Sequence, residues 1–140
     1  MTRTVAVIDY GMGNLRSVSQ AVAHVARAAD DVKVIVTGNP EEVFLAERIV
    51  LPGQGAMRDC MRELRDSGLR EAVLHAAANK PLMGVCVGMQ MLLTHSEDAQ
   101  GNITEYIYTT IADAPQPPGL LKEVRDPLGH LTRYAYDEHG

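Results

Sequence analysis

The sequence predicts an α/β protein built on an open, doubly wound parallel sheet. Four short apolar stretches, at 4–9, 32–37, 48–51 and 82–85, lack polar alternation, which is typical of strands covered on both faces. Segments with helical spacing of apolar residues separate these stretches. Because strand and helix alternate along the chain, we expect parallel strands joined by right-handed crossovers.

The helices are identified by apolar spacing and by their end signals. In the segment 15–29, apolar residues recur at helical spacing and should pack on the sheet: Leu15, Val18, Val22, Val25, Ala26 and Ala29. Asn39, Pro40 and Glu42 predict a helix start with a capping box, followed by a short helix to about residue 47. The remaining helices are expected at 58–67, which Gly68 ends, at 69–78 and at 87–94.

Composition and charge exclude several classes of protein. With 140 residues, 46% apolar and 22% charged, the chain is neither disordered nor collagen-like in composition. Its longest apolar stretch, 82–93, is shorter than the roughly 18 residues of a membrane span, and the run at 5–8 is too short for a secretory leader. A net charge of −5 disfavours nucleic acids and membrane surfaces as partners. Two cysteines cannot form a disulfide framework, so a reducing, cytoplasmic compartment is expected.

The composition changes near residue 97, which predicts a domain boundary there. Residues 1–97 hold all seven methionines and both cysteines, whereas 98–140 hold four of the five tyrosines. The second part contains a repeat with a shift of 28 residues: Asp98, Gly101, Thr104, Tyr106 and Tyr108 recur as Asp126, Gly129, Thr132, Tyr134 and Tyr136. In each copy the alternating tyrosines should share one face of a strand. A fixed period is typical of stacked repeats, and the alternative is a polar β-hairpin extension.

One motif carries a candidate nucleophile. Gly84-Val85-Cys86-Val87-Gly88 stands where the fourth strand turns into a helix, and it has the G-x-nucleophile-x-G pattern of a nucleophile elbow. The glycines let strand and helix pass closely, and the helix N-terminus below the sulfur favours the reactive thiolate. Cys86 is therefore predicted to be nucleophilic. The alternative is that Cys86 is a small buried hydrophobic residue.

A second motif, Pro52-Gly53-Gln54-Gly55, follows the third strand and should lie at the carboxyl edge of the sheet, where open α/β proteins bind ligands. Its N–H groups, together with that of Val87, can bind the oxyanion of a tetrahedral intermediate. Taken alone, the motif is a plain strand-to-helix turn. The loop 9–14 also contains glycines, but Arg16 stands where a dinucleotide fingerprint needs its third glycine, so that site is not expected.

The sequence does not identify a general base for Cys86. His95 follows it, but nine residues of helix would separate the two by roughly 13 Å along the axis, far outside hydrogen-bond range. His24 and His75 are expected on helices as structural or solvent-facing residues. Cys60 is interpreted as a packing residue within a helix.

Three segments together resemble one protein family. They are Val7-Ile8-Asp9-Tyr10-Gly11-Met12-Gly13-Asn14-Leu15, Leu51-Pro52-Gly53-Gln54-Gly55-Ala56 and Gly84-Val85-Cys86-Val87-Gly88-Met89-Gln90. Over residues 1 to about 97 the chain is similar to the glutaminase subunits of imidazole glycerol phosphate synthase, which are class I glutamine amidotransferases of histidine biosynthesis.

This resemblance implies roles for individual residues. Cys86 would attack the carboxamide of glutamine, Gly53 and Gln54 would belong to the oxyanion strand, and Gln90 would help Gly53 to hold the substrate. The resemblance also implies a heterodimer with a cyclase subunit, which receives the ammonia and which the loop 9–14 would face. Neither a metal nor a cofactor is expected.

The sequence departs from this family after the elbow helix. The family's catalytic triad is completed by the His and Glu of a His-Pro-Glu motif, which this sequence does not contain. The C-terminal half of the sheet is therefore expected to be missing, and turnover to be impaired. Residues 98–140 instead resemble the rearrangement-hotspot, or YD-repeat, family, whose members build β-shells from many hairpins.

Three functions follow from these observations. The first is a glutaminase whose base comes from an unidentified element. The second is a catalytically inactive fusion or truncation product that joins a glutaminase fragment to a YD-repeat fragment and exposes an unpaired sheet edge. The third is a different elbow-cysteine hydrolase on a similar fold, which the matches at 9–14 and 52–55 disfavour.

Overall fold

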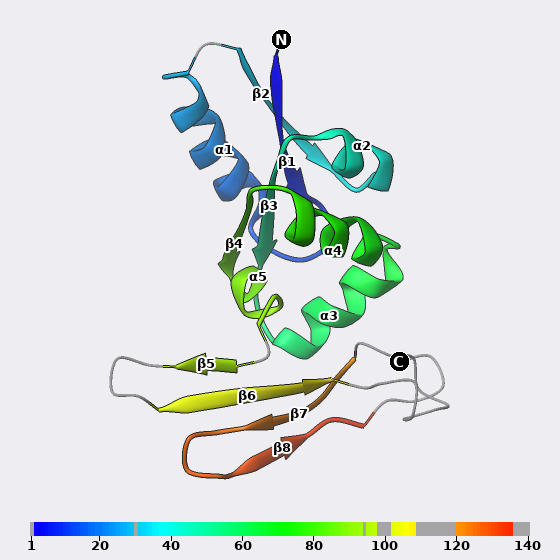
Figure 1. Cartoon of the computed structure of the whole chain (residues 1–140), viewed down its shortest axis with the longest axis vertical. Coiled ribbons are helices and arrows are strands. Elements are labelled where there is room, and N and C mark those ends of the chain that lie inside the picture. Colours follow the sequence, from blue (N-terminus) through cyan, green and yellow to red (C-terminus); the bar gives the residue numbers. More distant parts are fainter. Residues whose placement is uncertain (1, 30, 94, 98–101, 109–119, 136–140) are drawn as a thin grey trace.

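Two sheets organise the chain (Figure 1). The computed structural model describes residues 2–29, 31–93, 95–97, 102–108 and 120–135, with the backbone alone at 95–97. The first sheet is parallel, has the order β2-β1-β3-β4, and is formed by β1 (Arg3–Ile8), β2 (Val32–Thr37), β3 (Arg48–Gly53) and β4 (Leu82–Cys86). The predicted α/β class with a parallel sheet is confirmed.

Helices cover both faces of this sheet (Figure 1). They are α1 (Leu15–Ala26) on one face and α2 (Pro40–Leu45), α3 (Met57–Asp66) and α4 (Arg70–Asn79) on the other. Side chains of alternate residues in β1 lie on opposite faces of the sheet. Val5 and Val7 lie on the face covered by α1, whereas Ala6 and Ile8 belong to the core between the sheet and the helices of the other face. This division gives the parallel sheet two apolar layers.

The first helix begins as its sequence predicts but packs along only part of its length. The side chain of Asn14 accepts the N–H of Ser17 and so caps the N-terminus. Val18 and Val22 pack on the sheet, but Val25 is 72% exposed, so the prediction that it faces the core is wrong. The last turn of α1 instead borders a hollow at the amino ends of β3 and β4.

The second helix is capped differently from the prediction. Asn39 does accept the N–H of Glu41, at 2.9 Å, and Pro40 is the first helical residue. Glu42, however, accepts a short hydrogen bond from the hydroxyl of Thr37 and so does not form the expected capping box. The N–H of Asn39, which the capping box would have paired with Glu42, instead donates to the side-chain oxygen of Thr37 at the end of β2, at 2.9 Å.

The helix after the elbow is much shorter than predicted. It is α5 (Val87–Gln90), and the next residues continue only as a turn in which the N–H groups of Leu92 and Leu93 donate three residues back. Thr94, the predicted helix end, lies outside the described residues. The chain then enters a second sheet at residue 95, directly after the position where the longer helix was expected to end.

The second sheet is antiparallel and has the order β5-β6-β7-β8. Its strands are β5 (His95–Glu97), β6 (Ile103–Tyr108), β7 (Leu121–Arg125) and β8 (Leu131–Arg133). The repeated residues Thr104 and Thr132 lie in β6 and β8, but Tyr134 follows the end of β8, so the expected strand position for it is wrong. Asp98, Gly101 and Tyr136 of the repeat lie outside the described residues.

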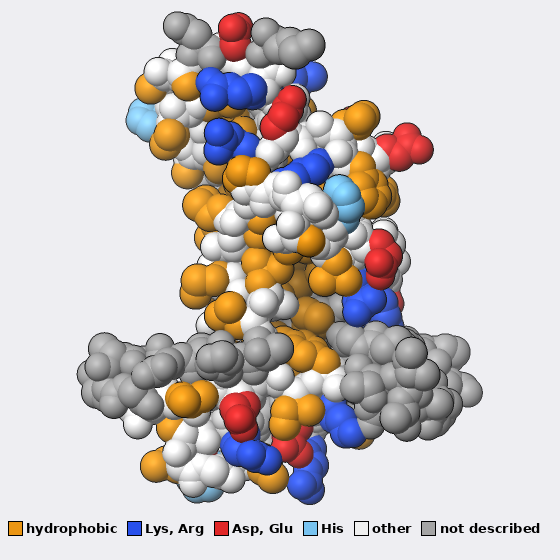
Figure 2. All heavy atoms as spheres, in the orientation of Figure 1, with side chains coloured by type: hydrophobic (Ala, Val, Ile, Leu, Met, Phe, Trp, Pro, Cys, Tyr) orange, Lys and Arg blue, Asp and Glu red, His pale blue; other side chains and the backbone are white. Residues whose placement is uncertain are grey.

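The second sheet packs against the first region near α3 and α5 (Figure 1). The hydroxyl of Tyr108 donates to the carbonyl of Leu93, at 3.3 Å, and lies 3.5 Å from the sulfur of Met57. The guanidinium of Arg58 lies over the ring of Tyr134, 5.9 Å from its centroid. Figure 2 shows hydrophobic side chains gathered in this middle part of the molecule. Within the described ranges, no helix has both the length and the apolar character to span a membrane.

Candidate active site

The two sequence motifs meet at the carboxyl edge of the parallel sheet. Gly53, the last residue of β3, is the register partner of Cys86, the last residue of β4. Cys86 is a free, exposed cysteine. Its backbone has φ +57° and ψ −123°, and among the described non-glycine residues only Asp31 also has a positive φ. Such backbone strain costs about 1–3 kcal/mol and is found mainly at functional sites.

Three glycines allow the elbow to sit directly on β3. A Cβ on Gly53 would lie 2.3 Å from the nitrogen of Gly88, and one on Gly88 would lie 2.0 Å from the carbonyl oxygen of Leu51. A Cβ on Gly84 would lie 2.4 Å from the Cα of Met89. All three contacts are with backbone atoms, which cannot rotate away. The elbow therefore has its position because two backbones touch without intervening side chains.

Two buried side chains hold the end of β3 and the turn that follows it. The hydroxyl of Tyr10 donates to the carbonyl of Pro52, at 2.8 Å, and the thiol of Cys60 donates to the carbonyl of Gln54, at 3.3 Å. Tyr10 is 3% exposed and Cys60 is fully buried. Burial, with a smaller contribution from the neighbouring Cys60 thiol, raises the pKa of Tyr10 well above its ordinary value. The neutral phenol, which can donate a hydrogen bond, is therefore favoured.

The loop 9–14 lies against the same turn. Asp9 accepts the N–H of Gly11, at 3.2 Å, and Gly11 and Gly13 have φ of +88° and +104°. A Cβ on Gly13 would lie 3.0 Å from the Cβ of Pro52. Glycine is therefore needed at residue 13 for both the backbone conformation and the close approach.

The other predicted site residues are distributed around Cys86. Val87, whose N–H was expected to bind an oxyanion, is buried at the start of α5. Gln90, the predicted substrate-binding residue, is the last residue of α5 and is half-buried. Gln54 is exposed at the turn opposite Cys86. All three lie on the two segments that the glycine contacts bring together.

The described histidine side chains have contacts elsewhere. The ring of His75 packs edge-on against Phe44, with 5.0 Å between centroids, and Nδ1 of His130 lies 2.8 Å from a carboxylate oxygen of Asp126. His24 is exposed on α1. The backbone of His95 pairs with Glu105 in the second sheet, so the continuous helix that was used to exclude it does not exist. The distance argument against His95 is therefore wrong. The side chain of His95 lies outside the part of the chain that the structure describes.

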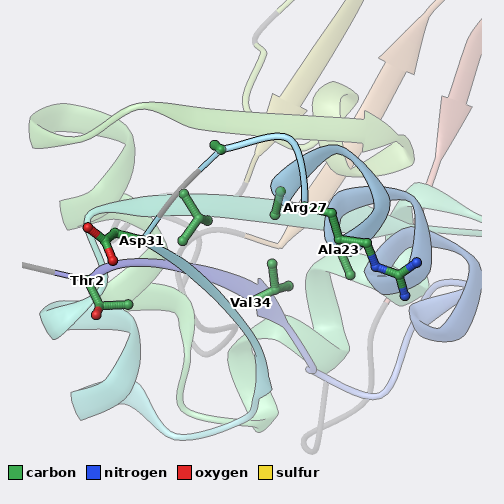
Figure 3. Close-up of a pocket in the computed structure, with 8 residues that line it drawn as sticks. Thr2, Ala23, Arg27, Asp31 and Val34 are labelled. Atoms are coloured by element: carbon green, nitrogen blue, oxygen red, sulfur yellow. The ribbon is translucent and has the colours of Figure 1, made fainter.

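Two hollows occur away from this edge. The hollow of about 490 Å³ in Figure 3 is lined by Thr2, Ala23, Arg27, Asp31 and Val34, among others, at the end of α1 and the amino ends of β1 and β2. A second hollow, of about 690 Å³, lies between α1 and the amino ends of β3 and β4. Neither hollow includes Cys86 or the turn after β3. Because open α/β proteins bind ligands at the carboxyl edge, the elbow remains the candidate site.

Sequence reasoning missed the residues that support the turn. Tyr10 was noted only as part of a motif, and Cys60 was interpreted as packing alone. A tyrosine hydroxyl next to a buried strand gives only a weak indication of its hydrogen-bond partner. For Tyr10 that partner, the Pro52 carbonyl, is 42 residues away in the chain. The hydrogen bond from Cys60 spans six residues and follows from the helix start at Met57, which places the thiol under the preceding turn.

Comparison with known proteins identifies a family and several relatives. The family of class I glutamine amidotransferases matches residues 6–114, which extends past the boundary expected at 97. The imidazole glycerol phosphate synthase subunit HisH of Dechloromonas aromatica is 61% identical over 101 residues, which are 72% of this chain and 45% of that protein. The subunit HisH of Nitrosospira multiformis is 59% identical over 100 residues, 71% of this chain and 45% of that protein. That of Thiobacillus denitrificans is 48% identical over 121 residues, 81% of this chain and 52% of that protein. The chain spans about half the length of the curated relatives that it matches.

Proposed function

The chain belongs to the class I glutamine amidotransferase family, and on that premise we propose that it is the glutaminase subunit of an imidazole glycerol phosphate synthase. It would hydrolyse glutamine to glutamate and ammonia and supply the ammonia to a cyclase subunit. The observation that carries the proposal is the pairing of Cys86, in a strained backbone conformation, with Gly53 at the carboxyl edge of the sheet. The similarity to HisH subunits supports the choice of substrate and partner.

The chemistry begins at the sulfur of Cys86. The thiolate attacks the carboxamide carbon of glutamine, the C–N bond breaks, and ammonia leaves after protonation of its nitrogen. Water then hydrolyses the γ-glutamyl thioester to glutamate and restores the thiolate. The backbone N–H groups of Gly53, Gln54 and Val87 would bind the oxyanion that forms in each step.

Substrate binding is assigned to the same edge. Gly53 offers its backbone, since it has no side chain to obstruct a ligand, and Gln90 stands four residues after Cys86 on α5. Gln90 is half-buried, which suits a side chain that must be both positioned and accessible. The loop 9–14, adjacent to Pro52, would face the cyclase subunit in a heterodimer.

Turnover by this chain alone is expected to be slow. The described His75 and His130 are engaged with Phe44 and Asp126, and the sequence contains no His-Pro-Glu motif. Loss of triad members typically lowers rates by several orders of magnitude. A catalytically inactive fusion or truncation product, which joins a glutaminase fragment to a YD-repeat fragment, is therefore the alternative. Thr104 and Thr132, equivalent positions of the repeat, lie in strands of one antiparallel sheet and support the repeat part of that alternative.

The test is ammonia release from glutamine by the purified chain, with and without a cyclase subunit. Cys86→Ala removes the nucleophile. We expect weak release that needs Cys86 and rises with the cyclase subunit. Release that persists in Cys86→Ala would contradict the role of Cys86, and a folded wild-type chain without any release would favour the inactive alternative.

A further inference from the structure

We propose that Tyr10 and Cys60 are positioning residues that set the direction of the backbone N–H groups at the end of β3, where the oxyanion would bind. This inference rests on the proposed glutaminase function and adds two residues to it. Neither side chain would touch substrate. Both act through the carbonyl groups of the turn, which they hold from the buried side.

The argument starts from the planarity of the peptide bond. In a trans peptide the carbonyl of one residue and the N–H of the next point in opposite directions and move as one plane. The Pro52 carbonyl therefore sets the N–H of Gly53, and the Gln54 carbonyl sets the N–H of Gly55. Tyr10 holds the first of these planes and Cys60 holds the second.

These two anchors are placed where the sheet itself provides less support. The pairing of β1 with β3 ends at Val7 and Val50, so the Pro52 carbonyl lies beyond that ladder. Gly53 and Gly55 lack side chains that would restrict rotation, and Gly55 has φ +87°. On the other side, β3 pairs with β4 as far as Gly53 and Cys86. Without Tyr10, the Pro52–Gly53 plane would be held by β4 alone, and without Cys60, the Gln54–Gly55 plane could turn and change the direction of its N–H group. The N–H of Gln54 lies between the two held planes and is restricted by both.

The two anchors also contact each other and the elbow helix. The neighbouring Cys60 thiol contributes to the raised pKa of the Tyr10 phenol, and the Tyr10 hydroxyl lies 3.5 Å from the sulfur of Met91. Met91 follows α5 directly and is 8% exposed. The same buried cluster therefore contacts the turn after β3 and the segment that carries the nucleophile, which couples the two halves of the oxyanion site.

The test measures how fast Cys86 is alkylated by two reagents, which does not need a general base. The γ-chloroketone analogue of glutamine has a carbonyl that the oxyanion N–H groups would polarise as the Cys86 sulfur displaces chloride from the adjacent carbon. Iodoacetamide, from which the sulfur displaces iodide, reports only the exposure and reactivity of the thiol. The ratio of the two rates, with modification of Cys86 verified by mass spectrometry, isolates the contribution of the oxyanion site from loss of folding.

We expect Tyr10→Phe and Cys60→Ala each to lower this ratio by about tenfold, and Cys60→Ser, which keeps a donor, to restore much of it. Val73→Ala, a core change in α4 away from the turn, should leave the ratio unchanged. Circular dichroism identifies any variant that fails to fold. An unchanged ratio in both Tyr10→Phe and Cys60→Ala would overturn the inference. A wild-type chain that reacts no faster with the chloroketone than with iodoacetamide would instead overturn the proposed function, and the inference with it.

Discussion

The nitrogen of Gly88 lies so close to Gly53 that a methyl group on Gly53 would come within 2.3 Å of it. This contact joins the segment after Cys86 to the strand that carries the proposed oxyanion donors. Cys86 and the turn after β3 are thereby held at a fixed separation by backbone atoms, which vary less in position than side chains. The candidate site therefore depends on glycines as much as on cysteine.

Gly88→Ala tests this packing. Its Cβ would lie 2.0 Å from the carbonyl oxygen of Leu51, so α5 must move away from β3. We expect a loss of about 3 kcal/mol or more in the free energy of unfolding, because overpacking against backbone cannot be relieved by a rotamer change. Urea denaturation measures the loss. Gly68→Ala is the control: it has φ +74° but no atom within 4 Å, and should cost only roughly 1 kcal/mol. Equal costs for the two variants would contradict the close backbone contact.

Lys80→Met tests how α2 is held. The ammonium of Lys80 donates to the carbonyls of Val43, Phe44 and Ala46 at the C-terminal end of this helix. A cation there also interacts favourably with the helix dipole. We expect a loss of about 1–2 kcal/mol in the free energy of unfolding. Thermal and urea unfolding measure it, with Lys33→Met, at an exposed position of β2, as the control. An equally large loss of unfolding free energy in Lys33→Met would show that removal of a positive charge alone, and not the contacts of Lys80, destabilises the chain.

Tyr108 should make the stability sensitive to alkaline pH. Burial, with a smaller contribution from Tyr106, raises the pKa of Tyr108 from 10.0 to about 12. Because the folded chain favours the neutral phenol, this contribution to stability is complete below pH 10 and is lost as the pH rises to about 12. Melting temperatures of the wild-type chain and of Tyr108→Phe, measured across this range, should converge as the pH rises. Tyr10 affects both proteins equally, so parallel curves would show that Tyr108 does not contribute.

The hairpin between β7 and β8 should respond to acid through Asp126. One carboxylate oxygen accepts the N–H groups of Leu128, at 2.9 Å, and His130, at 2.8 Å. Partial desolvation opposes ionisation, but the hydrogen bonds from His130 and Leu128 outweigh it and lower the pKa of Asp126 below 3.8. The contribution to hairpin stability is therefore present above pH 3.8 and is lost as the pH falls through the lower folded value.

Amide hydrogen exchange at Leu128 and His130 measures this effect. Protection should fall as the carboxylate is protonated, whereas Asp126→Asn should show a weaker dependence on pH because its amide oxygen still accepts both N–H groups. The same acid response in Asp126→Asn as in the wild-type chain would exclude Asp126 as its origin.

Parts of the fold follow from local patterns in the sequence. The strands of the parallel sheet form within two residues of their expected bounds, since continuous β-branched runs can be buried only between two layers. Asn39 caps its helix as expected, and Asn14 caps the first helix. Glu42 did not form the expected capping box, because Thr37 at the end of β2 offered a nearer partner once the strand and the helix were packed.

The length of α5 shows why other features could not be predicted. Its apolar spacing continues to Leu93, which indicates a longer helix, but the chain leaves the helix after Gln90 and reaches a second sheet at residue 95. The competing interaction is the pairing of β5 with β6, whose partners are six to ten residues apart in the chain. Periodicity cannot weigh a helix turn against such a ladder, since both are compatible with the same side chains.

The sequence by itself determined the α/β class and the position of the elbow with Cys86 at its tip, because strand runs, glycine spacing and a cysteine between two glycines are properties of contiguous residues. The tertiary structure alone decided that Gly53 lies beside Cys86, that Val25 is left exposed, and that Tyr10 and Cys60 hold the turn after β3. These relationships join residues on different elements. They exist only after the sheet has assembled and two backbones have come into contact.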